Sequence, residues 1–292
     1  DEAPDVDDDL ALIASMAGSI ISVVEEVPNQ RLKFADETDE RYIEDGRRED
    51  EIIAYAWDKF LDTLDPVWLP RLPMTKASMR AMDVIQREHP SIKEFVVMGA
   101  SKRGWTTWTV GAVDNRVIAI IPGVIDVLNL PKSLPNHFDA YGFWAPATHD
   151  YEDMGLFDRV DTPEFDALCE LVDPYRYLDR YTMPKYLVNS AGDQFFTPDS
   201  WQFYYNDLPG EKHLRYMPNS DHGLNADAYF GLASFHHAIL NDTPRPVYEW
   251  RMESDGTLVV ECDTHATKVL LWQATNPNAR DFRLEEIGPA YT

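Results

Sequence analysis

The sequence predicts an α/β fold in which a mostly parallel sheet is flanked by helices. Short apolar runs, each long enough for one strand, alternate with segments whose apolar residues recur at helical spacing. Strands separated by helices pair in parallel, because the helix carries the chain back to the starting edge of the sheet. Polar residues directly follow several of the apolar runs, where a parallel sheet gathers its loops. A chain of 292 residues can build one large core with a small appendage.

The first third of the chain is expected to supply helices around one central strand. An amphipathic helix over residues 51–63 is predicted from apolar positions that recur on one helical face. The other expected elements are a short helix over residues 10–16, buried or short strands over 19–27, 67–69 and 95–98, and a helix capped by Thr75.

The rest of the chain is expected to complete the sheet and to add two further parts. Strands are predicted over 116–121, 185–188 and 212–217, and helices over 200–206 and 226–240. Residues 129–181 are rich in Pro and aromatic residues and too long for a plain loop, which indicates a cap inserted over a site. The expected core is therefore 1–242. Short strands over 247–252, 257–262 and 267–272 predict a β-rich extension over 243–292, complete or cut short at the chain end.

Residues 94–110, EFVVMGASKRGWTTWTV, predict a nucleophile elbow. An apolar strand runs into Gly99-Ala-Ser101 and a helical segment follows at once, so that Ser101 lies at the tip of a strand-to-helix turn. Gly99 allows the tight turn, and a helix N-terminus favours developing negative charge. The usual motif has a second glycine two residues after the serine. Arg103 stands there and Gly104 comes one later, which shifts the helix packing by one position. The alternative is an ordinary strand-to-loop turn that contains Gly-x-Ser.

Three expected strand ends carry Ser101, Asp193 and His222, in the chain order of the α/β-hydrolases. A serine hydroxyl needs a base to take its proton, and a histidine with a pKa near 6.5 can accept and return it. Asp193 would orient the imidazole and stabilise its cation. Asp126, after the preceding strand, is the alternative acid. The structural alternatives are that Asp193 stabilises its own turn and that His222 caps a helix or is exposed.

An oxyanion hole is expected around the N–H group of Lys102, the residue after the nucleophile. Its second donor is expected from the loop after the 19–27 strand, near Asn29 or Gln30. Lys102 and Arg103 also place two cations beside the serine, which can stabilise an oxyanion, bind an acidic substrate, or pair with carboxylates or face solvent.

Aromatic residues suggest where an acyl or sugar group would lie. Trp144 and Tyr141 of the expected cap are candidate substrate-binding residues, with a core position as the alternative. Trp105 and Trp108 are expected in the core, because they lie on the buried elbow helix.

The composition excludes several function classes. The formal charge of −25 argues against nucleic acid, since phosphate binding needs clustered cations. No apolar run approaches ~18 residues, so no membrane span is expected. The two cysteines lie far apart and suggest no disulfide framework. The histidines show no metal-ligand spacing and no glycine-rich phosphate loop is present, so neither a metal nor another cofactor is expected.

The segments GASKRGWTTW, VNSAGDQFFTPDS, PNSDHG and LWQATNPNARDFR resemble the PhoPQ-activated pathogenicity-related protein family. The likeness also includes VPNQ near the start and so extends over nearly the whole chain. It implies an α/β-hydrolase fold with a C-terminal β-rich extension and a secreted or periplasmic setting. Ser101, Asp193 and His222 match the expected triad positions of the family. Family members are usually longer at the N-terminus, which implies that the first sheet strands are lacking or that the chain is trimmed.

These observations lead to a serine hydrolase acting on a small-molecule carboxylic ester, with small amides or peptides as a further substrate class. The alternative is a non-enzymatic secreted binding or signalling protein built on a hydrolase scaffold. A weaker third hypothesis is a lyase or transferase that uses Lys102 and Arg103 on an acidic substrate.

Overall fold

The computed structural model describes residues 8–292, which form two compact units. The sheet unit comprises Ser22–Ala228 and Asn276–Pro289. The hairpin unit comprises residues 8–21, Tyr229–Thr275 and Ala290–Thr292. The chain passes from one unit to the other at residues 228–229, ahead of the predicted boundary at residue 242.

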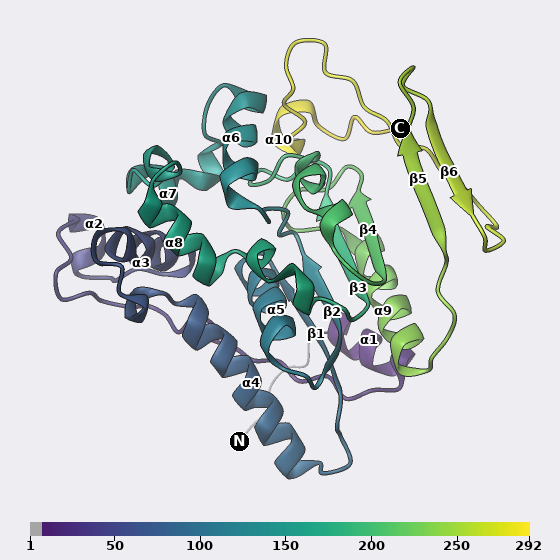
Figure 1. Cartoon of the computed structure of the whole chain (residues 1–292), viewed down its shortest axis with the longest axis horizontal. Coiled ribbons are helices and arrows are strands. Elements are labelled where there is room, and N and C mark those ends of the chain that lie inside the picture. The colour runs from purple at the N-terminus through teal and green to yellow at the C-terminus, as the bar shows by residue number, and fades with distance from the viewer. Residues whose placement is uncertain (1–7) are drawn as a thin grey trace. The chain divides into compact units, whose positions relative to one another are not determined.

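The sheet unit is built on a four-stranded parallel sheet in the order β1-β2-β3-β4 (Figure 1). The register pairs Ala100 with Gly123, and Ser190 with Met217. All four strands were predicted, and they are β1 Phe95–Ala100, β2 Val117–Gly123, β3 Lys185–Ser190 and β4 Lys212–Met217. Because the strands are parallel, their carboxyl ends lie along one edge, and the loops that follow β1, β3 and β4 gather there.

Helices cover this sheet. Helix α5 (Lys102–Val113) follows β1 directly and packs against β1, β2 and α4 (Arg71–Glu88). Helix α3 (Glu49–Thr63) contains the predicted helix, but burial is not confined to one face, because the six consecutive residues 52–57 are all buried. The unit also holds the short helices α2 (Glu40–Ile43) and α10 (Leu284–Ile287).

The segment between β2 and β3, predicted to be a cap, is helical. It contains α6 (Leu130–Tyr141), α7 (His149–Asp153), α8 (Pro163–Val172) and the 3-10 turns Pro146–Thr148, Phe157–Arg159 and Pro174–Arg180. The buried carboxylate of Asp173 accepts bonds from the N–H groups of Asn129 (3.2 Å) and Leu130 (2.8 Å), which fastens the end of the insertion to its start. Burial raises the pKa of Asp173 to about 6.

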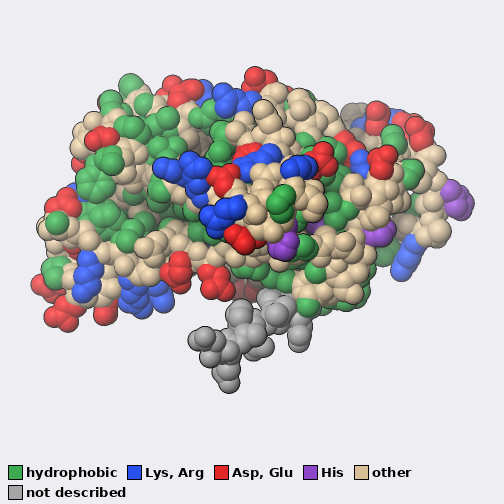
Figure 2. All heavy atoms as spheres, turned by 90° about the horizontal axis from the view of Figure 1, so that it is seen from below, with side chains coloured by type: hydrophobic (Ala, Val, Ile, Leu, Met, Phe, Trp, Pro, Cys, Tyr) green, Lys and Arg blue, Asp and Glu red, His purple; other side chains and the backbone are tan. Residues whose placement is uncertain are grey.

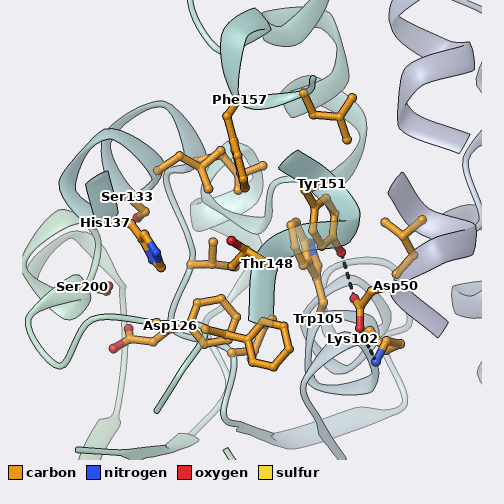
Figure 3. A pocket seen from close by; sticks show the side chains of 18 of the residues that line it. Asp50, Lys102, Trp105, Asp126, Ser133, His137, Thr148, Tyr151, Phe157 and Ser200 are labelled. Atoms are coloured by element: carbon orange, nitrogen blue, oxygen red, sulfur yellow. Dashed lines mark hydrogen bonds and ion pairs between the residues drawn. The ribbon is translucent and has the colours of Figure 1, made fainter. Parts of the chain in front are cut away.

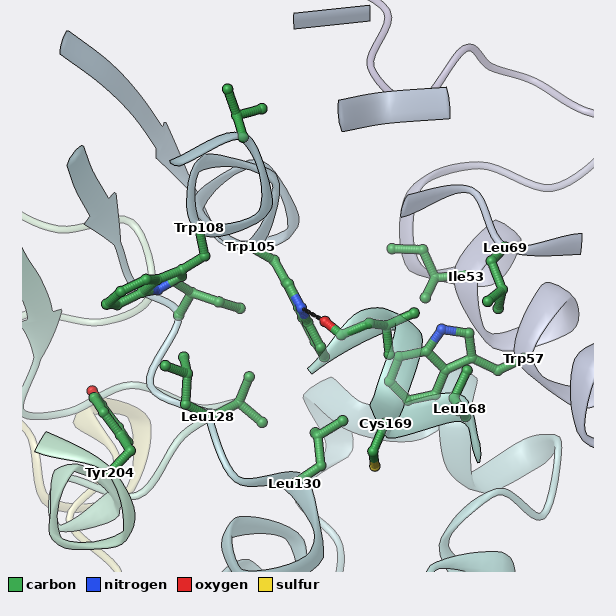
Figure 4. Close-up of a cluster of buried hydrophobic side chains, with 14 of the residues drawn as sticks. Ile53, Trp57, Leu69, Trp105, Trp108, Leu128, Leu130, Leu168, Cys169 and Tyr204 are labelled. Carbon is green, nitrogen blue, oxygen red and sulfur yellow. Dashed lines mark hydrogen bonds between the residues drawn. The ribbon is translucent and has the colours of Figure 1, made fainter. Parts of the chain in front are cut away.

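The core joins α3, α5 and this insertion through aromatic side chains (Figure 4). Trp108 is fully buried and meets the ring of Tyr181 edge-on at 4.9 Å. Trp105 packs against Trp57 and donates its indole N–H to the carbonyl of Val172. Both elbow-helix tryptophans are therefore core residues, as expected. Truncating a buried tryptophan costs about 3–5 kcal/mol, so this cluster holds the insertion firmly to the sheet unit.

Four secondary-structure predictions were wrong. Residues 19–27 form no strand and are mostly exposed, because no described strand lies beside them to share a ladder. Residues 67–69 form no strand, because Val67 and Trp68 belong to a 3-10 turn (Pro66–Trp68) in which the side chain of Asp65 accepts the N–H of Val67. Thr75 lies inside α4, not at its start, and its hydroxyl bonds the carbonyl of Arg71. Residues 267–272 form no strand. The helix predicted over 200–206 is present as two short 3-10 helices, Ser200–Phe203 and Tyr205–Asp207.

The hairpin unit contains α1 (Asp8–Ala17), most of α9 (Ala226–Leu240), and the antiparallel strands β5 (Tyr248–Met252) and β6 (Leu258–Cys262). The predicted Asp255-Gly256 turn is confirmed. Gly256 has a φ of 86°, and the carboxylate of Asp255 accepts the N–H of Thr257.

Charged side chains of both signs stand beside one another on the face shown in Figure 2. Exposed ion pairs such as Arg87–Glu88 contribute only about 0–1 kcal/mol each. Within residues 8–292, every helix is too short or too polar to cross a lipid bilayer.

Candidate active site

Ser101 lies at the predicted strand-to-helix turn, between β1 and α5. Its φ of 55° and ψ of −128° are rare for a residue with a side chain and are typical of strained functional positions. The N–H of Ser101 donates to the carbonyl of Gly123 at 2.8 Å. Two glycines permit the close approach of α5, since a Cβ on Gly99 would lie 2.6 Å from the Arg103 carbonyl, and one on Gly104 would lie 2.8 Å from that of Gly123. The shifted glycine therefore serves helix packing.

Asp193 and His222 follow β3 and β4 and meet at the same sheet edge. Nδ1 of His222 lies 2.8 Å from Oδ2 of Asp193, whose side chain is 3% exposed. The other oxygen of Asp193 accepts the N–H groups of Phe195 (2.7 Å) and Phe196 (3.3 Å). The Asp193 carboxylate thus stabilises its own turn and also binds the imidazole. The sequence analysis had given these two roles as alternatives.

The second ring nitrogen of His222 is buried, and no described residue, Ser101 included, hydrogen-bonds to it. The bond from Nδ1 to a carboxylate favours the tautomer with its proton on Nδ1, which leaves Nε2 as a free base. The imidazole is held in place by Phe195, whose ring centre lies 4.5 Å away, and by a bond from the N–H of His222 to the side chain of Gln194.

A cavity opens beside the elbow (Figure 3). Its empty volume is about 840 Å³, including the part open to solvent. Ser101 and Lys102 line it from the elbow, and Phe195 and Phe196 line it from the loop that carries Asp193. The two phenylalanines also contact His222, so the cavity wall connects the serine with the Asp193–His222 pair.

The two cations after Ser101 are neutralised within the protein. Nζ of Lys102 lies 3.0 Å from Glu49 and 2.9 Å from Asp50, and the guanidinium of Arg103 binds Glu49 at 2.8 Å. The Tyr151 hydroxyl donates to Asp50 at 2.9 Å and adds α7 to the network (Figure 3). Of the predicted functions for these cations, pairing with carboxylates is the one observed. Arg103 does not line the cavity.

The loop expected to supply the second oxyanion donor, near Asn29 and Gln30, differs in part from the prediction. The strand expected before it is absent, as described above, and Asn29 is exposed. Gln30 does lie close to the elbow. Its side-chain nitrogen donates to Glu49 at 2.8 Å, and its side-chain oxygen accepts the N–H of Glu49 at 3.2 Å. Glu49 in turn binds Lys102, so Gln30 is one residue removed from the elbow helix.

The candidate cap aromatics occupy different positions. Trp144 lines the cavity and stacks on Phe157 with ring centres 3.8 Å apart. Tyr141 lies outside the lining and packs against His137 and Phe143. Sequence reasoning missed several wall residues, including Phe157, Phe195 and Phe196. The last two directly follow Asp193-Gln194 and could have been noticed there.

Asp126, the alternative acid, is held by two tyrosines. The hydroxyls of Tyr204 and Tyr216 each donate to one of its carboxylate oxygens. Burial raises the pKa of Asp126 to about 7. The carboxylate that binds His222 is that of Asp193. Among residues 8–292, no group of three or more His, Cys, Asp or Glu side chains is arranged to hold a metal ion.

A strained serine at a strand-to-helix turn and a His–Asp pair after later parallel strands characterise an α/β-hydrolase fold. The model of the PhoPQ-activated pathogenicity-related protein family matches residues 1–283. The chain belongs to this family. Family membership thus confirms the resemblance noted in the sequence.

The chain is also similar to one curated protein, the autocrine proliferation repressor protein A of Dictyostelium discoideum. The two are 38% identical over 299 residues, which is 96% of this chain and 59% of that protein. The chain therefore spans about three-fifths of the length of this relative.

Solved structures with a similar fold include acetyl xylan esterases from Paenibacillus sp. R4 and from Thermoanaerobacterium. Each has a TM-score of 0.49 and 17% identity. The first match covers 60% of this chain and 55% of the other, and the second covers 66% and 59%.

Proposed function

We propose that the chain is a serine hydrolase that acts on carboxylic esters, with small amides or peptides as a further substrate class. The observation that carries the proposal is the Asp193–His222 bond of 2.8 Å, with the other ring nitrogen buried and without a hydrogen-bond partner among residues 8–292. The strained backbone of Ser101 supports it, because strain of this kind persists where the surrounding structure enforces it.

In the proposed reaction the Ser101 hydroxyl attacks the acyl carbon while Nε2 of His222 takes its proton. Asp193 holds the Nδ1–H and stabilises the imidazolium that forms. The oxyanion would bind the N–H of Lys102 at the start of α5, and Gln30 is the candidate source of the second donor. The imidazolium then protonates the leaving oxygen. Water, deprotonated by the same histidine, releases the acid and restores Ser101.

The test is labelling with a fluorophosphonate, which reacts with activated serines. Wild-type protein is expected to be labelled, whereas Ser101→Ala and His222→Ala are not. Ser234→Ala is the matched control, because Ser234 is an exposed serine of α9 whose hydroxyl donates to the carbonyl of Phe230 in the same helix. Equal labelling of wild type and Ser101→Ala, or no labelling of folded wild type, would count against the proposal.

A second candidate is a secreted binding or signalling role that needs no catalysis. The name of the Dictyostelium relative, an autocrine proliferation repressor, is the observation that favours it. The same name and the family support a secreted or periplasmic setting for this chain. Purified wild type and Ser101→Ala would be added to growing Dictyostelium cells. Equal repression by both would favour binding, repression by wild type alone would favour hydrolysis, and repression by neither would remove this candidate.

A further inference from the structure

We propose that the cavity beside Ser101 is an acyl pocket that selects uncharged, apolar acyl groups much larger than acetyl. This inference rests on the proposed hydrolase function and deepens it. It concerns which acyl group the enzyme accepts. Its main support is that the polar side chains of the cavity wall already have hydrogen-bond or ion-pair partners within the protein.

The three acidic or basic residues of the wall, Asp50, Lys102 and Asp126, are all bound by protein partners. Asp50 and Lys102 lie 2.9 Å apart and bind each other. Asp126 is bonded by two tyrosine hydroxyls. An anionic acyl group would find the Lys102 ammonium already paired with two carboxylates, and a cationic one would find Asp50 paired with Lys102 and both oxygens of Asp126 bound by tyrosines. Either charge would lose hydration without full compensation.

The neutral polar side chains of the wall are also occupied. Ser133 donates to the carbonyl of Leu128 at 2.7 Å, and Thr148 donates to that of Ala145 at 2.9 Å. The hydroxyls of Thr197 and Ser200 bond each other at 2.9 Å. The donor hydrogens of Ser133 and Thr148 are therefore already used, so an acceptor oxygen of a polar acyl group would have to displace an existing bond to pair with them.

His137 is the remaining wall residue that can become a cation, and it is held neutral. Its Nε2 accepts the N–H of Ala145 at 3.0 Å, which requires an unprotonated nitrogen. Burial lowers the pKa of His137 to about 4. The wall thus presents no cation near neutral pH at this position either.

The remaining surface is aliphatic and aromatic, and besides Phe195 and Phe196 of the Asp193 loop it includes Ile125 and Val127 after β2. Helix α3 contributes Ile53 and Trp57, the elbow helix contributes Trp105, and the insertion contributes several residues. Figure 3 places Phe157 across the cavity from Lys102, the neighbour of Ser101. An acyl chain bound at Ser101 would therefore extend toward the stacked Trp144–Phe157 pair.

The size of the cavity separates this proposal from an acetyl esterase. Twenty-three residues line the cavity, from Ser101 and Lys102 at the elbow to Trp144 and Phe157 of the insertion. An acetyl group would leave most of this wall uncovered. Burial of one methylene is expected to raise kcat/KM about fourfold until the pocket is full, from the transfer free energy of a methylene.

The test is hydrolysis of p-nitrophenyl acetate, butyrate, hexanoate and octanoate by wild-type protein. We expect kcat/KM to rise along the series, by about a hundredfold or more from acetate to octanoate. Thr148 lies in the cavity in Figure 3, so Thr148→Phe fills it. In that variant the ratio of kcat/KM for octanoate to kcat/KM for acetate should fall toward one. Val84→Phe, on the exposed face of α4, is the matched control and should keep the wild-type profile.

A second measurement separates failure of this inference from failure of the proposed function. Octanamide and acetamide are titrated into folded Ser101→Ala while the fluorescence of Trp105 and Trp144 in the wall is followed. Saturable binding of octanamide alone supports the apolar pocket even if fluorophosphonate labelling fails. The acyl-pocket inference is overturned if wild type is labelled by the fluorophosphonate but kcat/KM does not rise along the ester series. It is also overturned if octanamide shows no saturable binding. In both cases the hydrolase proposal is left to its own test.

Discussion

Replacing Glu49 by glutamine should weaken the ion-pair network behind the nucleophile. Glu49 binds Lys102 at 3.0 Å and Arg103 at 2.8 Å. Glutamine keeps the shape of the side chain and removes its charge. Both cations then lose a carboxylate partner, and only Asp50 still pairs with Lys102. The network therefore loses charge while its packing is retained.

The magnitude follows from the pKa of Glu49. Partial burial raises this pKa, but hydrogen bonds from Arg103 and Lys102 outweigh burial and hold it at about 2, against 4.5 for the free side chain. At ~1.36 kcal/mol per pKa unit, the full shift corresponds to about 3 kcal/mol. The side chain is 31% exposed, and solvent screening reduces the expected loss to about 1–2 kcal/mol.

The sign of the pH dependence is fixed by the direction of this shift. A carboxyl with a lowered pKa in the folded state stabilises the fold above pH 4.5, and this stabilisation is lost as the pH falls toward 2. The difference in the free energy of unfolding between wild type and Glu49→Gln should therefore be full at pH 7 and much smaller at pH 3.

The assay is urea unfolding followed by tryptophan fluorescence, because Trp57 and Trp105 are buried in the same unit as Glu49. Glu88→Gln is the matched control. It removes the same charge from a pair with Arg87 at 3.0 Å whose glutamate is 62% exposed, and it should change stability by less than about 0.5 kcal/mol. Equal losses in both variants, or a Glu49→Gln loss that does not change with pH, would refute the reasoning.

Three further outcomes are expected. Asp193→Asn should slow fluorophosphonate labelling by about 10³–10⁴-fold with an unchanged urea midpoint, because the amide no longer holds the Nδ1–H tautomer of the histidine; normal labelling would contradict this. Gly104→Ala should cost about 1–3 kcal/mol in urea unfolding, since its Cβ would lie 2.8 Å from the Gly123 carbonyl; a neutral result would show that the helix can move away. Asp126→Asn should flatten the pH dependence of stability. Burial raises the pKa of Asp126 to about 7 from 3.8, so the wild type should lose stability relative to the variant as pH rises from 4 to 7. Urea midpoints at pH 4 and 7 that move in parallel would exclude this.

The local turns of the site could be read from the sequence. The apolar run before Gly99 and the helical spacing after Ser101 predicted the strand-to-helix turn, and the structure has both. Asp193 and His222 were found in the same way, because each follows a short apolar run in a protein whose strands are parallel. Such signals depend on neighbours in the chain, so no tertiary information was needed to see them.

The absence of a strand over residues 19–27 could not be predicted from local signals of this kind. The apolar run of this segment resembles those of the four observed strands, but a strand forms only where another strand offers hydrogen bonds to its edge. The run therefore lacks the partner that would order it within the described chain, and most of its side chains are exposed.

The sequence by itself determined the parallel sheet, the elbow at Ser101 and the order of the three candidate catalytic residues, since these follow from local periodicity and turn chemistry. Only the tertiary structure decided which carboxylate binds His222, where the charges of Lys102 and Arg103 are neutralised, and which aromatic residues form the cavity. These depend on side chains from distant segments, such as Glu49 of α3 and Tyr151 of α7. Their meeting is fixed by packing in three dimensions, which the spacing of residues along the chain does not encode.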